Sequence, residues 1–115
     1  MQREIKTNDR MRCIFEEGKQ QLPVINDEGS LIGLAEMFKA LGDSTRLEIL
    51  SLLLIEELCK CEIVSALSLP GSTVAHHLKI MEKGGVIKGR REGKYTIYRL
   101  CEDRLELIIA FLLKQ

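Results

Sequence analysis

The sequence has no long apolar run, no excess of one charge sign and no internal repeat. No stretch of 18 apolar residues occurs among the 115, so no segment is predicted to cross a membrane as a helix. The N-terminal residues lead into no apolar region of the kind that a secretory signal requires. The formal net charge is zero. We therefore expect a globular chain in the reducing cytoplasm, where cysteines are metal ligands or redox groups before they are structural disulfides.

The length and composition fit one small domain preceded by an arm. Apolar content of 45% with 30% charged residues is ordinary for a globular protein, and a chain of this size buries a modest core unless it dimerises. We expect residues 1–30 to form an arm that is mobile or packs on a partner subunit, with a short helix over residues 11–21. Pro23 and residues 26–29 indicate a turn. Residues 31–115 are expected to form the main domain.

The apolar periodicity predicts the elements of that domain. Leu34 to Leu41 has the spacing of a helix, and Asp43 is placed to cap a second, mostly apolar helix that would form the centre of the core. The further expected elements are a helix over 58–67, a helix over 72–81, strands over 86–91 and 94–100, and a final helix over 102–113. This order predicts a mainly α, winged helix-turn-helix fold with four helices, a two-stranded β wing and a C-terminal dimerisation helix.

The segment from Ser72 to Met81 has the pattern of a recognition helix. Val74, Leu78 and Met81 form a narrow apolar stripe that would face the core, and Ser72 is a suitable N-cap. A surface helix without a ligand is the alternative. The polar and basic residues left on the other faces are the candidate DNA contacts: Ser72, Thr73, His76, His77 and Lys79.

The charge distribution favours DNA as the partner, although the whole chain is neutral. Residues 72–99 contain seven Lys or Arg and two Glu, which leaves this stretch at +5. Arg90, Arg91 and Lys94 gather at the expected hairpin tip, where they would neutralise phosphates of a double-stranded DNA operator. The last helix is too apolar for a lone surface helix, so we expect it at the interface of a homodimer.

Two cysteines have a spacing that makes metal binding conditional on local structure. The side chains of Cys59 and Cys61 would diverge by about 200° on a regular helix, and they can converge only if the pair straddles a helix start. A helix N-terminus also lowers the pKa of a thiol and favours the thiolate. Thiolates select thiophilic ions. Because two sulfurs are rarely enough, a third ligand is needed.

Four segments in order resemble the ArsR/SmtB family of metal-responsive repressors. They are Ala40–Leu50, the Glu57–Ile63 box around the two cysteines, Ser72–Leu78, and Arg90–Tyr95. The resemblance implies a DNA-binding repressor released by As(III), Cd(II) or Pb(II), with no organic cofactor. It also implies that Cys13 or Cys101 completes the site. Pro70, Gly71 and Ala75 depart from the polar residues that many members carry at these positions.

Two alternatives to ion sensing stay open, and an enzyme is not expected. Oxidation could be the signal, through Cys13 or Cys101. A thiolate metal buffer that never binds DNA would use the cysteines but leave the helix-turn-helix unexplained. Neither His76 nor His77 has an evident acid to orient it for base catalysis.

Overall fold

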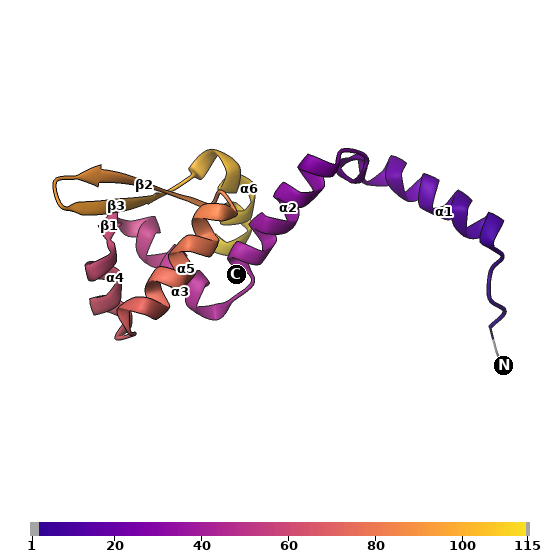
Figure 1. Ribbon diagram of the computed structural model, residues 1–115. Helices are drawn as coiled ribbons and strands as arrows, with labels where there is room; N and C mark the ends of the chain where they lie inside the picture. Colours follow the sequence, from indigo (N-terminus) through magenta and orange to yellow (C-terminus); the bar gives the residue numbers. More distant parts are fainter. Residues whose placement is uncertain (1–2, 115) are drawn as a thin grey trace. The chain divides into compact units, whose positions relative to one another are not determined.

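The computed structural model describes residues 3–114, and Figure 1 shows the elements in chain order. The chain divides into two compact units, one ending at Gly33 and one beginning at Leu34. The elements are α1 (Asn8–Gln21), a 3-10 turn η1 (Pro23–Asn26), α2 (Glu28–Leu41), α3 (Ser44–Ile55), β1 (Leu58–Cys59), α4 (Lys60–Leu67), α5 (Gly71–Lys83), β2 (Ile87–Glu92), β3 (Tyr95–Leu100) and α6 (Glu102–Leu113). No helix in residues 3–114 is long and apolar enough to span a bilayer.

The first unit is more helical than the sequence indicated. Helix α1 begins at Asn8 rather than Met11, because the Thr7 hydroxyl accepts a hydrogen bond from the Arg10 backbone N–H at 3.1 Å. The turn expected from Pro23 and residues 26–29 is confirmed up to Asp27 and wrong for its last two residues, since Glu28 and Gly29 already belong to α2. Asp27 provides the reason, because its carboxylate accepts a hydrogen bond from the Ser30 backbone N–H at 3.2 Å.

The second unit has one core built around α3 and α5. The expected stripe of α5 is confirmed, because Val74, Leu78 and Met81 are all at most 1% exposed. Helix α3 is central but has one open side, where Ile55 is 81% exposed. The predicted cap of α3 is also confirmed, with the Asp43 carboxylate 3.2 Å from the Arg46 backbone nitrogen. The other fully or nearly buried apolar residues are Met37, Ala40, Ile49, Leu50, Leu53, Ile63, Val86, Ile87, Leu100 and Leu105.

The wing is a three-stranded antiparallel sheet in the order β1–β3–β2, so the expectation of two strands is incomplete. The third strand consists only of Leu58 and Cys59, so the helix predicted over 58–67 begins two residues later, at Lys60. Leu58 lies opposite Tyr98. The hairpin loop lies at Gly93 and Lys94, one residue later than the sequence suggested. Gly93 has φ +60°, a conformation that glycine adopts without strain.

Helices α4 and α5 form the helix-turn-helix. Ser68 ends α4 in the left-handed region, with φ 54°, and Pro70 takes the N-cap position of α5. Ser72 therefore lies inside the first turn and is not the cap, because α5 begins one residue earlier, at Gly71. Helix α5 ends at Lys83, two residues beyond the predicted end at Met81 and directly before Gly84 and Gly85.

A glycine permits α5 to end against α2. A Cβ atom built on Gly84 would lie 2.6 Å from both the Glu36 carbonyl oxygen and the Ala40 Cβ. Only glycine fits that approach without displacing backbone. Gly84 and Gly85 thus follow the end of α5, and Gly84 allows that end to lie against α2.

Candidate nucleic-acid interface and metal centre

Helix α5 presents the predicted DNA-binding residues unequally. Ser72, His76 and Lys79 are exposed, whereas Thr73 and His77 are half-buried beside the core stripe. At the start of the helix, Pro70 brings no side-chain cap, and its carbonyl accepts the backbone N–H of Thr73 and of Val74 at 3.1 Å. The outward positions of α5 are therefore polar or basic over its N-terminal half, which is the half that enters the major groove in helix-turn-helix proteins.

The two histidines have different surroundings. The rings lie 5.7 Å apart in an edge arrangement, so they do not converge on one ion. The His77 side chain is only 13% exposed, and its Nδ1 lies 3.0 Å from Nη1 of Arg46. Sequence reasoning placed Arg46 inside α3 but missed this contact. The available signal was the only basic residue of a mostly apolar helix, since a buried charge needs partners.

Arg90, at the predicted wing tip, is held by carboxylates. Its Nη2 lies 2.8 Å from Glu57 Oε1 and 3.3 Å from Glu92 Oε2. The hydrogen bond from Arg90 lowers the pKa of Glu57 below its ordinary value, and the same pair raises the pKa of Arg90. A phosphate that binds this guanidinium must therefore compete with Glu57.

The other two basic residues of the tip are less constrained. Arg91 donates to Thr96 Oγ1 and to the Gly93 carbonyl, both at 3.4 Å, and the Lys94 ammonium lies 5.4 Å from the centre of the Tyr95 ring. Such long, exposed contacts exchange readily for stronger ones. The wing thus offers two accessible cations beside a third that is already paired.

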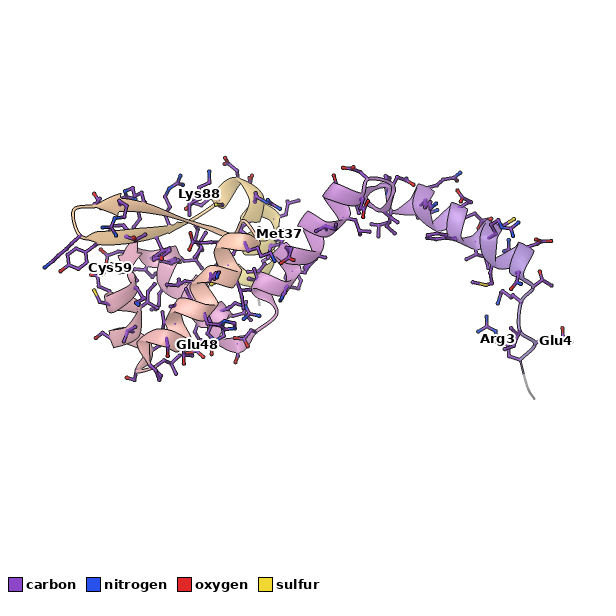
Figure 2. All side chains as sticks on the ribbon, viewed as in Figure 1. Arg3, Glu4, Met37, Glu48, Cys59 and Lys88 are labelled. Carbon is purple, nitrogen blue, oxygen red and sulfur yellow. The ribbon has the colours of Figure 1, made fainter. Side chains whose placement is uncertain are left out.

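Cys59 and Cys61 converge because they straddle a helix start. Cys59 is in extended backbone at the N-cap of α4, whereas Cys61 lies in the first turn of that helix. Their Sγ atoms are 2.7 Å apart, and both residues are free cysteines. The predicted requirement for convergence, that the two cysteines straddle a helix start, is therefore met. That helix starts at Lys60, two residues later than the predicted start at Leu58. Figure 2 shows Cys59 where the small sheet meets α4.

Local hydrogen bonds hold the start of α4. The Glu62 carboxylate accepts the Cys59 backbone N–H at 2.9 Å, which is one half of a capping box and lowers the pKa of Glu62. The expectation of a lowered thiol pKa is wrong for Cys59. Its pKa is raised, first by the hydrogen bond with Cys61 and then by burial, because Cys59 is only 7% exposed.

The cysteine pair faces a pocket rimmed by basic residues of the wing. The pocket has a volume of about 360 Å³, and its lining is Cys59, Lys60, Cys61, Arg91, Lys94, Tyr95, Thr96 and Tyr98. Lys60, Arg91 and Lys94 thus place three basic side chains around the two thiols. Two soft donors that meet in an electropositive pocket suit a thiophilic ion, so the donor set fits the expected effector in type.

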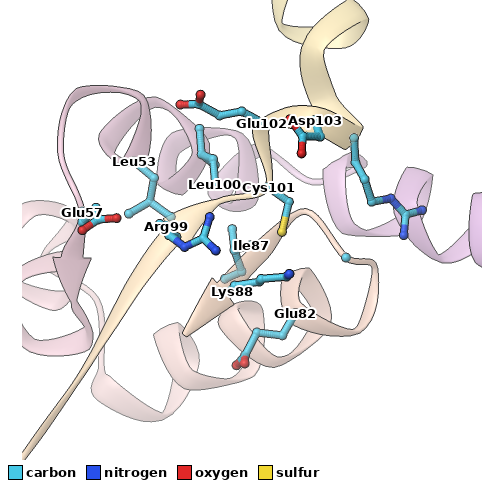
Figure 3. A pocket seen from close by; sticks show the side chains of 12 residues that line it. Leu53, Glu57, Glu82, Ile87, Lys88, Arg99, Leu100, Cys101, Glu102 and Asp103 are labelled. Atoms are coloured by element: carbon cyan, nitrogen blue, oxygen red, sulfur yellow. The ribbon is translucent and has the colours of Figure 1, made fainter. Parts of the chain in front are cut away.

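Of the remaining two cysteines, one lies elsewhere in the second unit and the other belongs to the first unit. Cys101 is half-buried at the N-cap of α6 and lines a different pocket, of about 700 Å³, together with Leu53, Ile87 and Lys88 (Figure 3). Cys13 is exposed on α1, in the first unit. Within residues 3–114, no three Cys, His, Asp or Glu side chains form a cluster suited to a metal ion. A complete site therefore needs a donor beyond the two that this conformation brings together.

Known proteins resemble this chain in sequence and in fold. The family described as bacterial regulatory protein, arsR family, matches residues 43–88. An uncharacterized HTH-type transcriptional regulator of Methanocaldococcus jannaschii is 46% identical over 76 residues, which cover 65% of this chain and 85% of that protein. A cadmium resistance transcriptional regulatory protein CadC homolog of Staphylococcus aureus is 37% identical, covering 69% of this chain and 68% of that protein.

A solved structure agrees with these relatives. The homodimeric winged helix-turn-helix DNA-binding domain of a possible ArsR-family regulator from Mycobacterium bovis superposes with a TM-score of 0.66 and 30% identity, over 72% of this chain and 77% of that one. The predicted fold is thereby confirmed. Membership of a family of DNA-binding regulators also excludes the alternative of a metal buffer that never binds DNA. The chain belongs to the ArsR/SmtB family and is a winged helix-turn-helix transcriptional repressor, not an enzyme.

Proposed function

We propose that this repressor leaves its operator when a thiophilic ion, As(III), Cd(II) or Pb(II), binds Cys59 and Cys61. The observation that carries the proposal is the 2.7 Å separation of the two sulfurs at the start of α4. The similar proteins include the CadC homolog and an arsenical resistance operon repressor of Staphylococcus aureus, which is 36% identical to this chain. The names of those proteins support an ion of this chemical type.

The position of the pair supports a direct effect on DNA binding. Cys59 belongs to β1, which pairs with the wing strand β3, and it is also the N-cap of the first helix of the helix-turn-helix. Any rearrangement that separates or rotates the two thiols therefore acts on the wing and on α4 together. By thermodynamic linkage, DNA must weaken ion binding by the same factor by which the ion weakens DNA binding.

A third thiol would complete the ligand set. Cys13 and Cys101 are the candidates, and each would connect the start of α4 to a different part of the protein. Cys101 would link it to the N-terminus of α6, and Cys13 would link it to α1 of the same chain or of a partner subunit. An ion held by three sulfurs would supply the binding free energy that shifts the dimer away from its DNA-binding geometry.

We further propose that the repressor acts as a homodimer on a pseudo-palindromic operator in the cytoplasm. Leu107 and Leu113 on α6 are 85% and 71% exposed, which is costly for an apolar helix in water and favours burial against a second copy. Two copies of α5 would then enter successive major grooves. Base or phosphate contacts are assigned to Ser72, Thr73, His76 and His77. Phosphates of the DNA backbone would be neutralised by Lys79, Arg90, Arg91 and Lys94.

The test is DNA binding by the full chain, measured by fluorescence anisotropy on its own promoter region under reducing conditions. Arsenite, Cd(II) and Pb(II) are titrated separately, with Mg(II) as a hard-ion control. The wild type should release DNA with one or more of the thiophilic ions, and Cys59→Ser should bind DNA equally well but resist release. Release of Cys59→Ser by the same ion would show that the site is misassigned. Release by a mild oxidant alone would assign the signal to thiol oxidation.

A further inference from the structure

Arg46 is the buried charged residue of the described chain, and all three ends of its guanidinium fork have partners. It is 8% exposed, near the N-terminus of α3. Its Nε donates to the Ala40 carbonyl at 3.1 Å, and its Nη2 donates to the Lys39 carbonyl at 2.9 Å. Both carbonyls belong to the last turn of α2, and the Lys39 carbonyl also accepts the Gly42 backbone N–H at 3.2 Å. These two hydrogen bonds fix the orientation of the guanidinium, whose remaining nitrogen, Nη1, contacts His77.

The contact between Nη1 of Arg46 and Nδ1 of His77, at 3.0 Å, determines which histidine nitrogen carries the proton. A guanidinium has five N–H donors and no acceptor, and it stays protonated in proteins. Nδ1 must therefore supply a lone pair. In a neutral imidazole with a free Nδ1, the proton lies on Nε2.

The other charged and titratable groups near His77 do not compete with this arrangement. The Asp43 carboxylate is 3.8 Å from Nδ1, beyond hydrogen-bond distance, and one of its oxygens already caps the Arg46 backbone N–H at 3.2 Å. His76 meets the His77 ring only edge to edge, at 5.7 Å between ring centres. Arg46 is therefore the group that sets the tautomer.

The other ring nitrogen, Nε2, is free for a ligand. It makes no hydrogen bond within residues 3–114, and no side-chain nitrogen or oxygen of a non-exposed residue in that range is both buried and without a partner. Nε2 of His77 therefore reaches the surface of α5. Thr73 lies one helical turn earlier on the same face, because residues at i and i+4 are neighbours.

We propose that Arg46 is a positioning residue that fixes His77 as the Nε2–H tautomer, so that the recognition helix presents an N–H donor to an acceptor on DNA. The acceptor is a phosphate oxygen or a base atom of the major groove, since both can accept a hydrogen bond from an N–H donor. The inference rests on the proposed use of α5 in DNA binding and adds the role of a residue that never touches the DNA.

The first experiment reads the tautomer in the free, full-length protein. Two-bond ¹H–¹⁵N correlation spectra near neutral pH distinguish a protonated from an unprotonated ring nitrogen. The expected spectrum has Nδ1 of His77 unprotonated and Nε2 protonated. Arg46→Lys keeps the charge but loses the planar fork, so its His77 should show a mixture of tautomers. An Nδ1–H ring in the wild type would overturn the proposal, whether or not Arg46→Lys folds.

The second experiment separates the two nitrogens by substitution. In His77→Asn, the amide oxygen can occupy the place of Nδ1 and accept from Arg46, but the outward donor is lost. In His77→Gln, the amide nitrogen can replace the Nε2–H donor. We expect His77→Asn to bind operator DNA roughly five- to tenfold more weakly at an almost unchanged melting temperature, and His77→Gln to recover part of that loss.

The comparison of two DNA sequences identifies the acceptor. An equal loss on operator and on unrelated DNA indicates a phosphate, whereas a loss confined to the operator indicates a base. Wild-type affinity in His77→Asn would overturn the proposal. Failure of the ion-release function is distinguishable, because it would leave wild-type DNA binding and the His77 spectrum unchanged.

Discussion

Cys59 lies directly opposite Ile97 in the ladder between β1 and β3, so the cysteine pair is built onto the wing itself. The residue that would bind the effector and the strand that leads from the basic hairpin tip are therefore joined by backbone pairing. The adjacent Glu57 adds a second link through its ion pair with Arg90. The proposed effector site and the basic wing therefore share one piece of backbone.

The Glu57–Arg90 pair predicts that removing a carboxylate strengthens DNA binding. Glu57→Gln should raise affinity about two- to fivefold, because Arg90 no longer exchanges Glu57 for a phosphate and one repulsive charge is gone. Anisotropy titrations at several salt concentrations measure this. Glu4→Gln removes the same charge from the segment before α1 and serves as the control. An unchanged or lower affinity in Glu57→Gln would show that Arg90 does not contact DNA.

The separation of Cys101 from the pair predicts which cysteine completes the site. Cys101 lines a different pocket of the same unit, whereas Cys13 is exposed on α1. Cys13→Ser should therefore weaken Cd(II) binding by roughly tenfold or more, while Cys101→Ser should change it little. Thiolate-to-metal absorption during a Cd(II) titration reports both the affinity and the number of sulfurs. The reverse ranking would assign Cys101 as the third ligand.

The Asp43 cap predicts a specific loss of stability in acid. The pKa of Asp43 is lowered, chiefly by the backbone N–H of Arg46. A group with a lowered folded-state pKa stabilises the protein above its unfolded pKa, near 4, and that contribution is lost as the pH falls through the folded-state value. Asp43→Asn keeps a cap that does not titrate, so its melting temperature should fall less between pH 6 and pH 3. Identical slopes would contradict the assignment.

The close approach at Gly84 predicts that a single methyl group destabilises the domain. Gly84→Ala should lower the free energy of unfolding by about 1–3 kcal/mol, because its Cβ would meet the backbone of α2. Gly71→Ala is the matched control, since its Cβ meets nothing within 4 Å. That change should be neutral or stabilising by up to about 1 kcal/mol. Urea denaturation measures both, and equal effects would show that α2 yields without cost.

The exposed face of α6 predicts how the dimer can be broken. Leu107→Glu places a charge on a side chain that is 85% exposed in the single chain but would be buried between two copies. Sedimentation velocity should show a monomer, and operator affinity should fall because one recognition helix replaces two. Leu107→Met is expected to stay dimeric. A dimeric Leu107→Glu would place the interface elsewhere.

The sequence alone determined those features that follow from local pattern. The apolar spacing of Val74, Leu78 and Met81 predicted the buried face of α5, because helical period fixes which residues share a face. Asp43 predicted the start of α3, because a cap bonds to a backbone N–H only three residues away. The alternation from Tyr95 to Leu100 predicted a wing strand for the same kind of reason.

Only the tertiary structure decided the contacts between residues that are far apart in the sequence. Leu58 and Cys59 form a strand because β3 lies beside them, and two residues are too few to show a period. Arg46 meets His77 across 31 positions, and Glu57 meets Arg90 across the sheet. Tertiary packing determined those partners, since a guanidinium donates to any nearby acceptor and no local rule selects one. The sequence thus predicted the recognition helix and the cysteine pair, whereas packing decided which residues hold them in place.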